Sequence, residues 1–78
     1  MSMTKTVSFE ERWAFVSKQA VLIKENTKDK ELADCLIAMV KELNKDLVIE
    51  IAHQIWLEDR NNNMLIDIAY NNIVNALV

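Results

Sequence analysis

Residues 47–58, LVIEIAHQIWLE, decide the fold class of this chain, because the segment opens as a continuous apolar run and continues as an amphipathic one. Its first five residues alone are typical of a buried β-strand. Over the whole segment, however, the polar residues recur at helical spacing: Glu50, His53, Gln54 and Glu58. The opposite row is apolar: Leu47, Ile51 and Ile55. The complete pattern therefore predicts an α-helix.

The segment that follows predicts a second C-terminal helix over residues 64–77. The loop before it, residues 58–63, ends in three asparagines, and Asn63 is a suitable N-cap. Six positions are expected to face the core: Leu65, Ile66, Ala69, Ile73, Ala76 and Leu77. The expected outward residues are Asp67, Asn71 and Asn75. Because the final residues are so apolar, we expect this helix to be docked rather than frayed.

The N-terminal half predicts a helix over residues 9–25. Ser8 and Glu11 have the spacing of a capping box, in which each side chain accepts from the other residue's backbone amide. The apolar row that follows has helical spacing: Phe9, Trp13, Val16, Ala20 and Ile23. Phe15 and Leu22, seven residues apart, add a second apolar line. This helix therefore carries more apolar surface than one neighbour can cover.

Residues 26–29 favour a turn, and a further helix is predicted over residues 30–43. Its expected apolar row is Leu32, Leu36, Met39 and Leu43, widened by Cys35 and Val40. The single cysteine is thus expected to pack as a small hydrophobic residue. At residues 44–46 two alternatives are open: a break with Asp46 as the next N-cap, or a continuous helix. We favour the break.

These segments predict an all-α fold, a bundle of three to four helices over approximately residues 9–25, 30–43, 47–58 and 64–77. A chain of 78 residues has room for one domain, with residues 1–7 as an N-terminal extension. The chain contains no glycine and no proline. This excludes glycine-rich phosphate-binding loops, and it leads us to expect that asparagine supplies any left-handed turn residue.

The formal net charge of −3 is unevenly spread along the chain. Residues 1–45 carry eight Lys or Arg against seven Asp or Glu, a net charge of +1. Residues 46–78 carry Arg60 against five carboxylates, a net charge of −4: Asp46, Glu50, Glu58, Asp59 and Asp67. This balance disfavours direct binding of nucleic acid. No uncharged stretch approaches the ~18 residues that cross a bilayer, so we expect a soluble, cytoplasmic protein.

Two short motifs carry residue types suited to catalysis or metal binding. Glu50 and His53 form a Glu-x-x-His, half of a helical-bundle di-iron site, which a symmetric dimer would have to complete. Glu31 and Asp34 resemble one half of the magnesium-binding motif of all-α nucleotide pyrophosphatases, whose other half is missing here. Solvated helix surface explains both motifs better. We therefore predict no catalytic residue, no metal ligand and no cofactor, and treat a metal-binding protein using Glu50 and His53 as a remote alternative.

The surplus of apolar residues, 51% of so short a chain, predicts that part of the surface meets another protein. We expect a non-enzymatic interaction module, either a helical homodimer or an adaptor or inhibitor of a partner protein, with no contact to a membrane. The candidate partner-binding residues are Trp13, Phe15, Leu22, Glu50, Trp56, Glu58 and Asp59. In size and charge the chain also resembles small phage and mobile-element inhibitors of nucleic-acid-binding machines, of the anti-CRISPR or anti-restriction class, and this is the alternative function.

Overall fold

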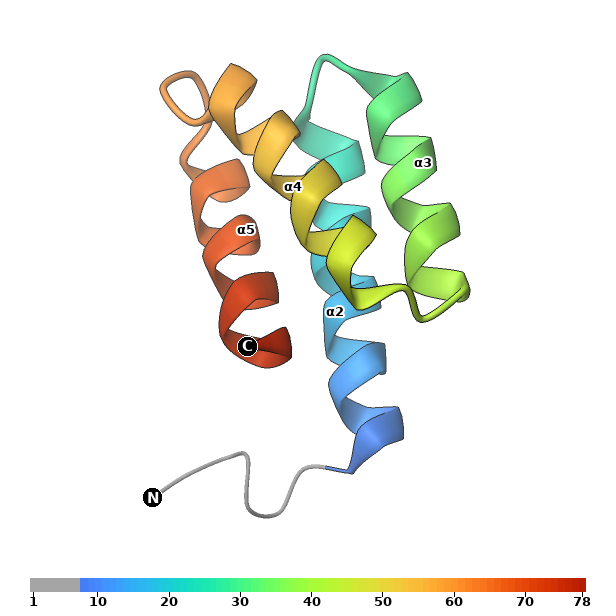
Figure 1. Ribbon diagram of the computed structural model, residues 1–78. Helices are drawn as coiled ribbons and strands as arrows, with labels where there is room; N and C mark the ends of the chain where they lie inside the picture. The colour runs from blue at the N-terminus through green and yellow to red at the C-terminus, as the bar shows by residue number, and fades with distance from the viewer. Residues whose placement is uncertain (1–7) are drawn as a thin grey trace.

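A computed structural model describes residues 8–78, and in this part the chain forms four α-helices joined by short loops. They are α2 (Phe9–Asn26), α3 (Lys30–Lys41), α4 (Lys45–Asp59) and α5 (Met64–Leu77). Successive helices run in opposite directions (Figure 1). The all-α bundle predicted from the sequence is thereby confirmed, while the expected extension, residues 1–7, lies outside the described residues. None of these four helices has the length and apolarity that crossing a membrane requires.

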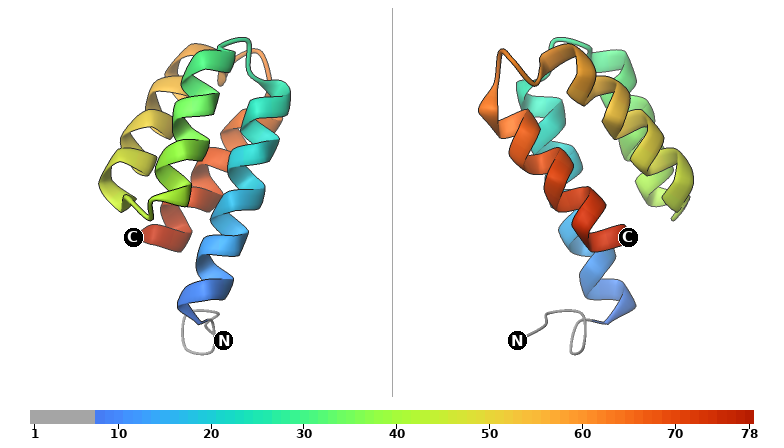
Figure 2. Two further views of the ribbon diagram at one scale, coloured as in Figure 1. Left: turned by 90° about the vertical axis from the view of Figure 1, so that its right-hand side faces the viewer. Right: turned by 60° about the vertical axis from the view of Figure 1, so that its left-hand side comes forward.

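The four helices form a ring in which each packs against its neighbours in sequence, and the ring closes between α2 and α5. Consequently α2 and α4 lie diagonally across the bundle, as Figure 2 shows from two sides. The first turns of α2 project beyond the ends of the other helices (Figure 1). Helices α4 and α5 are closest at the end where their loop joins them, and they diverge toward the other end.

The N-caps show why the helices begin where they do. Ser8 and Glu11 form the predicted capping box, with both reciprocal hydrogen bonds at 3.1 Å. Asn63 caps α5 as predicted, its Oδ1 accepting from the amide of Leu65 at 2.9 Å. Asp29 caps α3 through the amide of Leu32. Each cap satisfies amides that the first turn of a helix leaves without a partner.

The joint between α3 and α4 is a true break, as favoured from the sequence, but its details differ from the prediction. The cap of α4 is Asn44 and not Asp46, because the helix begins two residues earlier than expected. The residue with positive φ is Leu43 (φ 58°) and not an asparagine. The amide of Asn44 donates to the carbonyl of Met39, and that of Leu43 to Val40, both at 3.0 Å. These are the bonds of a Schellman motif, here built on leucine in place of glycine.

The core contains one alanine from each helix. Ala20, Ala33, Ala52 and Ala69 are all fully or almost fully buried. Small side chains let helix axes approach closely. The large side chains with no exposure are Val16, Ile23, Leu36, Val48, Ile55, Ile66 and Ile73. Leu77 is also buried, so the predicted docking of the C-terminal helix is confirmed.

Five side chains that the sequence placed in the core are exposed: Phe9, Cys35, Leu43, Leu47 and Leu65. Phe9 is 62% exposed because it belongs to the projecting first turn of α2. Leu43 lies beyond the end of α3. In α3 and α4 the buried rows run through Ala33 and Ala52, which rotates Cys35 and Leu47 toward solvent. The prediction failed there because it gave weight to large side chains and too little to alanine.

A polar network holds together the end of the bundle where two loops meet. The Thr27 hydroxyl, just after α2, donates to Oδ2 of Asp59, the last residue of α4, and both residues are buried. The amide of Lys28 donates to the same oxygen at 3.3 Å. Beside them, Nδ2 of Asn63 donates to Oδ1 of Asn26 at 3.1 Å. This end is therefore tied by hydrogen bonds as well as by apolar packing.

Candidate protein-binding surface

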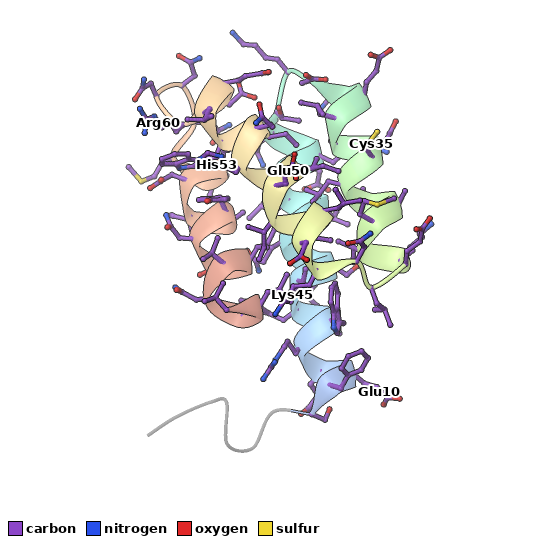
Figure 3. All side chains as sticks on the ribbon, in the orientation of Figure 1. Glu10, Cys35, Lys45, Glu50, His53 and Arg60 are labelled. Atoms are coloured by element: carbon purple, nitrogen blue, oxygen red, sulfur yellow. The ribbon has the colours of Figure 1, made fainter. Side chains whose placement is uncertain are left out.

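Three aromatic rings meet on the side of the bundle formed by α4 and α5. His53 and Trp56 come from α4 and stack with ring centroids 5.6 Å apart. Tyr70 of α5 lies 5.1 Å from Trp56 and 5.8 Å from His53, again between centroids. All three side chains are half-buried, so each ring keeps an edge or face toward solvent. Figure 3 shows His53 and Arg60 on the side of α4 that faces α5.

The indole of Trp56 is held on two sides. Its Nε1–H donates to Oδ1 of Asp67 at 2.7 Å, and the same oxygen accepts from Nδ2 of Asn71 at 3.3 Å. The guanidinium of Arg60 lies 4.5 Å from the centroid of the indole, in a cation–π contact. The indole orientation is therefore fixed before any partner arrives. We call the group His53, Trp56, Arg60, Asp67 and Tyr70 the aromatic face.

Acidic residues continue the aromatic face along α4. Asp46, Glu50, His53 and Leu57 follow one another at spacings of four, three and four, which places them in one row of the helix. Asp46 and Glu50 are exposed. Within residues 8–78, one ion pair shorter than 4 Å is present, and it joins Lys24 of α2 to Asp34 of α3. In that part of the chain, Asp46 and Glu50 therefore have no cationic partner. The row thus runs from unpaired carboxylates to the aromatic rings.

The structure divides the predicted partner-binding residues between different parts of the molecule. Trp56 belongs to the aromatic face, with Glu50 in the same row of α4 as His53. Glu58 is exposed but points away from Trp56, because residues two apart on a helix lie on nearly opposite sides. Phe15 and Leu22 are half-buried on α2, diagonally across the bundle from α4.

Two of the predicted partner-binding residues are buried, so the structure does not offer them to a partner. Trp13 packs in the core with Val16 and Ala20. Asp59, expected as part of an acidic surface, instead accepts hydrogen bonds from Thr27 and Lys28. Its position at the end of α4 turns it toward the α2–α3 loop. Sequence charge alone could not distinguish this internal acceptor from a surface acid.

The sequence did not lead us to predict Arg60, Tyr70 or Asp67 as members of a surface site, and His53 was considered only as a metal ligand. Trp56 and Arg60 are four residues apart, so the contact between them was visible in helical spacing. Tyr70 gave no comparable signal, because its contact with Trp56 depends on how α5 packs on α4. Asp67 was expected to point outward and is half-buried beneath the indole N–H instead.

The residue pairs considered for metal binding do not form clusters here. No group of three or more potential ligands, counting His, Cys, Asp and Glu, comes together within residues 8–78. The imidazole of His53 is engaged in the aromatic stack, and Glu50 lies one turn away in the same helix. Glu31 and Asp34 are both exposed on α3, where Oδ1 of Asp34 pairs with Nζ of Lys24 at 2.8 Å.

Comparisons with protein families, with curated proteins and with solved structures found no match to this chain. The chemistry of the aromatic face must therefore be interpreted from its own residues. Stacked rings, a guanidinium and a fixed carboxylate are suited to recognition, since they provide apolar area together with oriented hydrogen-bonding groups.

Proposed function

We propose that this protein is a non-enzymatic interaction module that binds a partner protein through the aromatic face. The observation that carries the proposal is the meeting of Trp56, Tyr70 and Arg60 on one side of the bundle. Tryptophan, tyrosine and arginine are the three residue types most enriched in binding hot spots. These side chains combine apolar area with hydrogen-bonding groups, which suits them to anchor a partner.

Two further features support a binding role for this surface. The hydrogen bond from Trp56 to Asp67 fixes the indole. Binding therefore costs less of the conformational entropy of the Trp56 side chain. Leu57 and Met64, which flank the loop between α4 and α5, are exposed large apolar side chains. Exposed apolar side chains beside hot-spot residues can exclude water from the contact.

The proposal is tested by capturing partners from the source cell with the tagged chain and then measuring the affinity of each purified partner by calorimetry. We expect Leu57→Ala and Arg60→Ala to weaken binding about tenfold or more, a loss of about 1.4 kcal/mol. Val21→Ala is the matched control, because Val21 is exposed to a similar degree on α2, and it should bind like the wild type. Unchanged affinity in both α4-side variants would remove the proposal.

An acidic inhibitor of a nucleic-acid-binding protein is a narrower form of the same function. The observation that favours it is the net charge of −4 over residues 46–78. In this case the captured partner binds nucleic acid, and an oligonucleotide competes with the chain for it. If the partner binds both together, without competition, this narrower function is wrong and the interaction module remains.

The homodimer expected from the sequence would use a different surface. Leu65 and Ile68 are exposed on α5, and α5 packs against α2, which carries the half-buried Phe15 and Leu22. An apolar surface of this kind can pair with its own copy across a two-fold axis. Light scattering at increasing concentration measures the mass, and Ile68→Asp should convert a dimer to a monomer. A single-copy mass at high concentration removes the homodimer.

A further inference from the structure

The charges around the aromatic face are negative in sum. Asp46, Glu50 and Asp67 contribute three carboxylates, against the guanidinium of Arg60 and the ammonium of Lys45, which begins the row of α4 that carries Trp56. Asp46 and Glu50 are exposed and have no cationic partner within 4 Å among residues 8–78. Exposed charges of one sign steer the approach of an oppositely charged surface and disfavour a surface of like charge.

The aromatic rings add a second preference for positive charge. The faces of tryptophan and tyrosine rings carry negative electrostatic potential and attract cations. The chain already uses this attraction internally, since the guanidinium of Arg60 lies over the indole of Trp56. Arg60 is exposed and lies beyond the end of α4, so a side chain of a partner can stack beside it over Tyr70.

A second copy of this chain is a poor occupant of the aromatic face. A two-fold dimer brings the same face of each copy together. A set of three carboxylates and two cations, negative in sum, would then meet an identical set, and like charges across an interface are costly. Nucleic acid, whose phosphates are negative, is disfavoured for the same reason.

From these observations we infer that the occupant of the aromatic face is a basic, amphipathic segment of another protein. The inference rests on the proposed function and adds the chemistry of the partner. Arginine or lysine side chains of this segment lie over the rings of Trp56 and Tyr70 and extend toward Asp46 and Glu50. Its apolar side chains meet Leu57.

The test uses short amphipathic peptides of leucine and arginine as the probe. Matched peptides carry glutamine or glutamate in place of arginine. Binding is followed on the full chain by two-dimensional NMR, in which the indole N–H signal of the half-buried Trp56 reports on the aromatic face and that of the buried Trp13 reports on the core. The arginine peptide should shift the signals of Trp56 and Tyr70, bind more tightly than the glutamine peptide, and weaken several-fold as salt rises from 50 to 300 mM. The glutamate peptide should bind least.

The double variant Asp46→Asn with Glu50→Gln removes two charges from exposed side chains and leaves the rings in place. It should weaken the arginine peptide roughly threefold to tenfold and leave the glutamine peptide unchanged. A matched control, Glu31→Gln with Asp34→Asn, removes two exposed charges from α3 and should change neither affinity.

Equal affinity for the arginine and glutamine peptides overturns the basic partner but leaves the proposed function intact. Shifts confined to α2 and α3, or the absence of any shift at Trp56 and Tyr70, also overturn the inference. The proposed function is judged separately, because it depends on how Leu57→Ala and Arg60→Ala bind the captured partner.

Discussion

The hydroxyl of Thr27 donates a hydrogen bond to the carboxylate of Asp59, and this contact joins positions 32 residues apart in the sequence. Both residues are buried, and the carboxylate also accepts from the amide of Lys28. The bond links the α2–α3 loop to the end of α4, directly before the loop that carries Arg60. We therefore regard it as the main polar tie at this end of the bundle.

Replacing Asp59 with alanine should destabilise the protein by about 2 kcal/mol, because a buried hydroxyl and a backbone amide lose a charged acceptor. The free energy of unfolding is measured in urea. Glu58→Ala, the exposed neighbour, is the control and should change stability by less than about 0.5 kcal/mol. In a double-mutant cycle with Thr27→Val, a coupling energy near zero would show that the hydrogen bond does not stabilise the fold.

Ile73 and Ile68 are a matched pair on α5, with 0% and 44% of the side chain exposed. Ile73→Ala removes buried methyl groups and leaves a cavity, so it should cost about 2–5 kcal/mol. Ile68→Ala should cost less than about 1 kcal/mol. Thermal and urea unfolding measure both. Similar losses in the two variants would mean that α5 is packed with a different face inward.

Leu43 is the residue at which a small change should raise stability. Its positive φ is unfavourable for leucine, because the Cβ atom clashes with the backbone, and glycine has no Cβ atom. Leu43→Gly is therefore expected to stabilise the protein by about 0.5–1 kcal/mol, despite the extra entropy that glycine adds to the unfolded chain. Leu47→Gly, within α4, should destabilise by about 1 kcal/mol. Destabilisation by both substitutions would show that Leu43 does not adopt a left-handed conformation in the folded protein.

Asp67 should control the orientation of Trp56. Asp67→Ala removes the acceptor of the indole N–H. It should lower the free energy of unfolding by about 1 kcal/mol. It should also shift the Trp56 indole signal markedly in NMR spectra. Asp67→Asn retains an oxygen acceptor and should restore most of that signal. Asp34→Ala, which removes only an exposed ion pair, is the control and should leave the signal in place. An indole signal unaffected by Asp67→Ala would contradict the fixed orientation.

The helices could be predicted from the sequence because their signals are local. Ser8 with Glu11, and Asn63, show where two helices begin, and the polar row around His53 shows that residues 47–58 do not form a strand. Which flank of each helix is buried was predicted less well. That choice depends on how α3 and α4 pack, which buries Ala33 and Ala52 and which periodicity within one helix does not contain.

The candidate site was only partly predictable for the same reason. Trp56 and Glu50 were chosen as residue types that favour binding, and the structure places Trp56 on the flank of α4 that contacts α5 and Glu50 on its exposed side. Tyr70 and Asp67 join Trp56 only through the packing of α5 on α4. Asp59 was expected at the surface because it is a charged residue in an acidic segment. In the structure it is buried against the loop that follows α2.

The most direct test of the central claim, that the aromatic face binds a partner protein, is site-specific photo-crosslinking in the source cell. A benzophenone amino acid replaces either Leu57, 47% exposed beside the aromatic face, or Val21, 43% exposed on the diagonal helix α2. The account predicts a discrete crosslinked protein from position 57, which Arg60→Ala weakens, and none from position 21. A crosslink from position 21 with none from position 57 would contradict it.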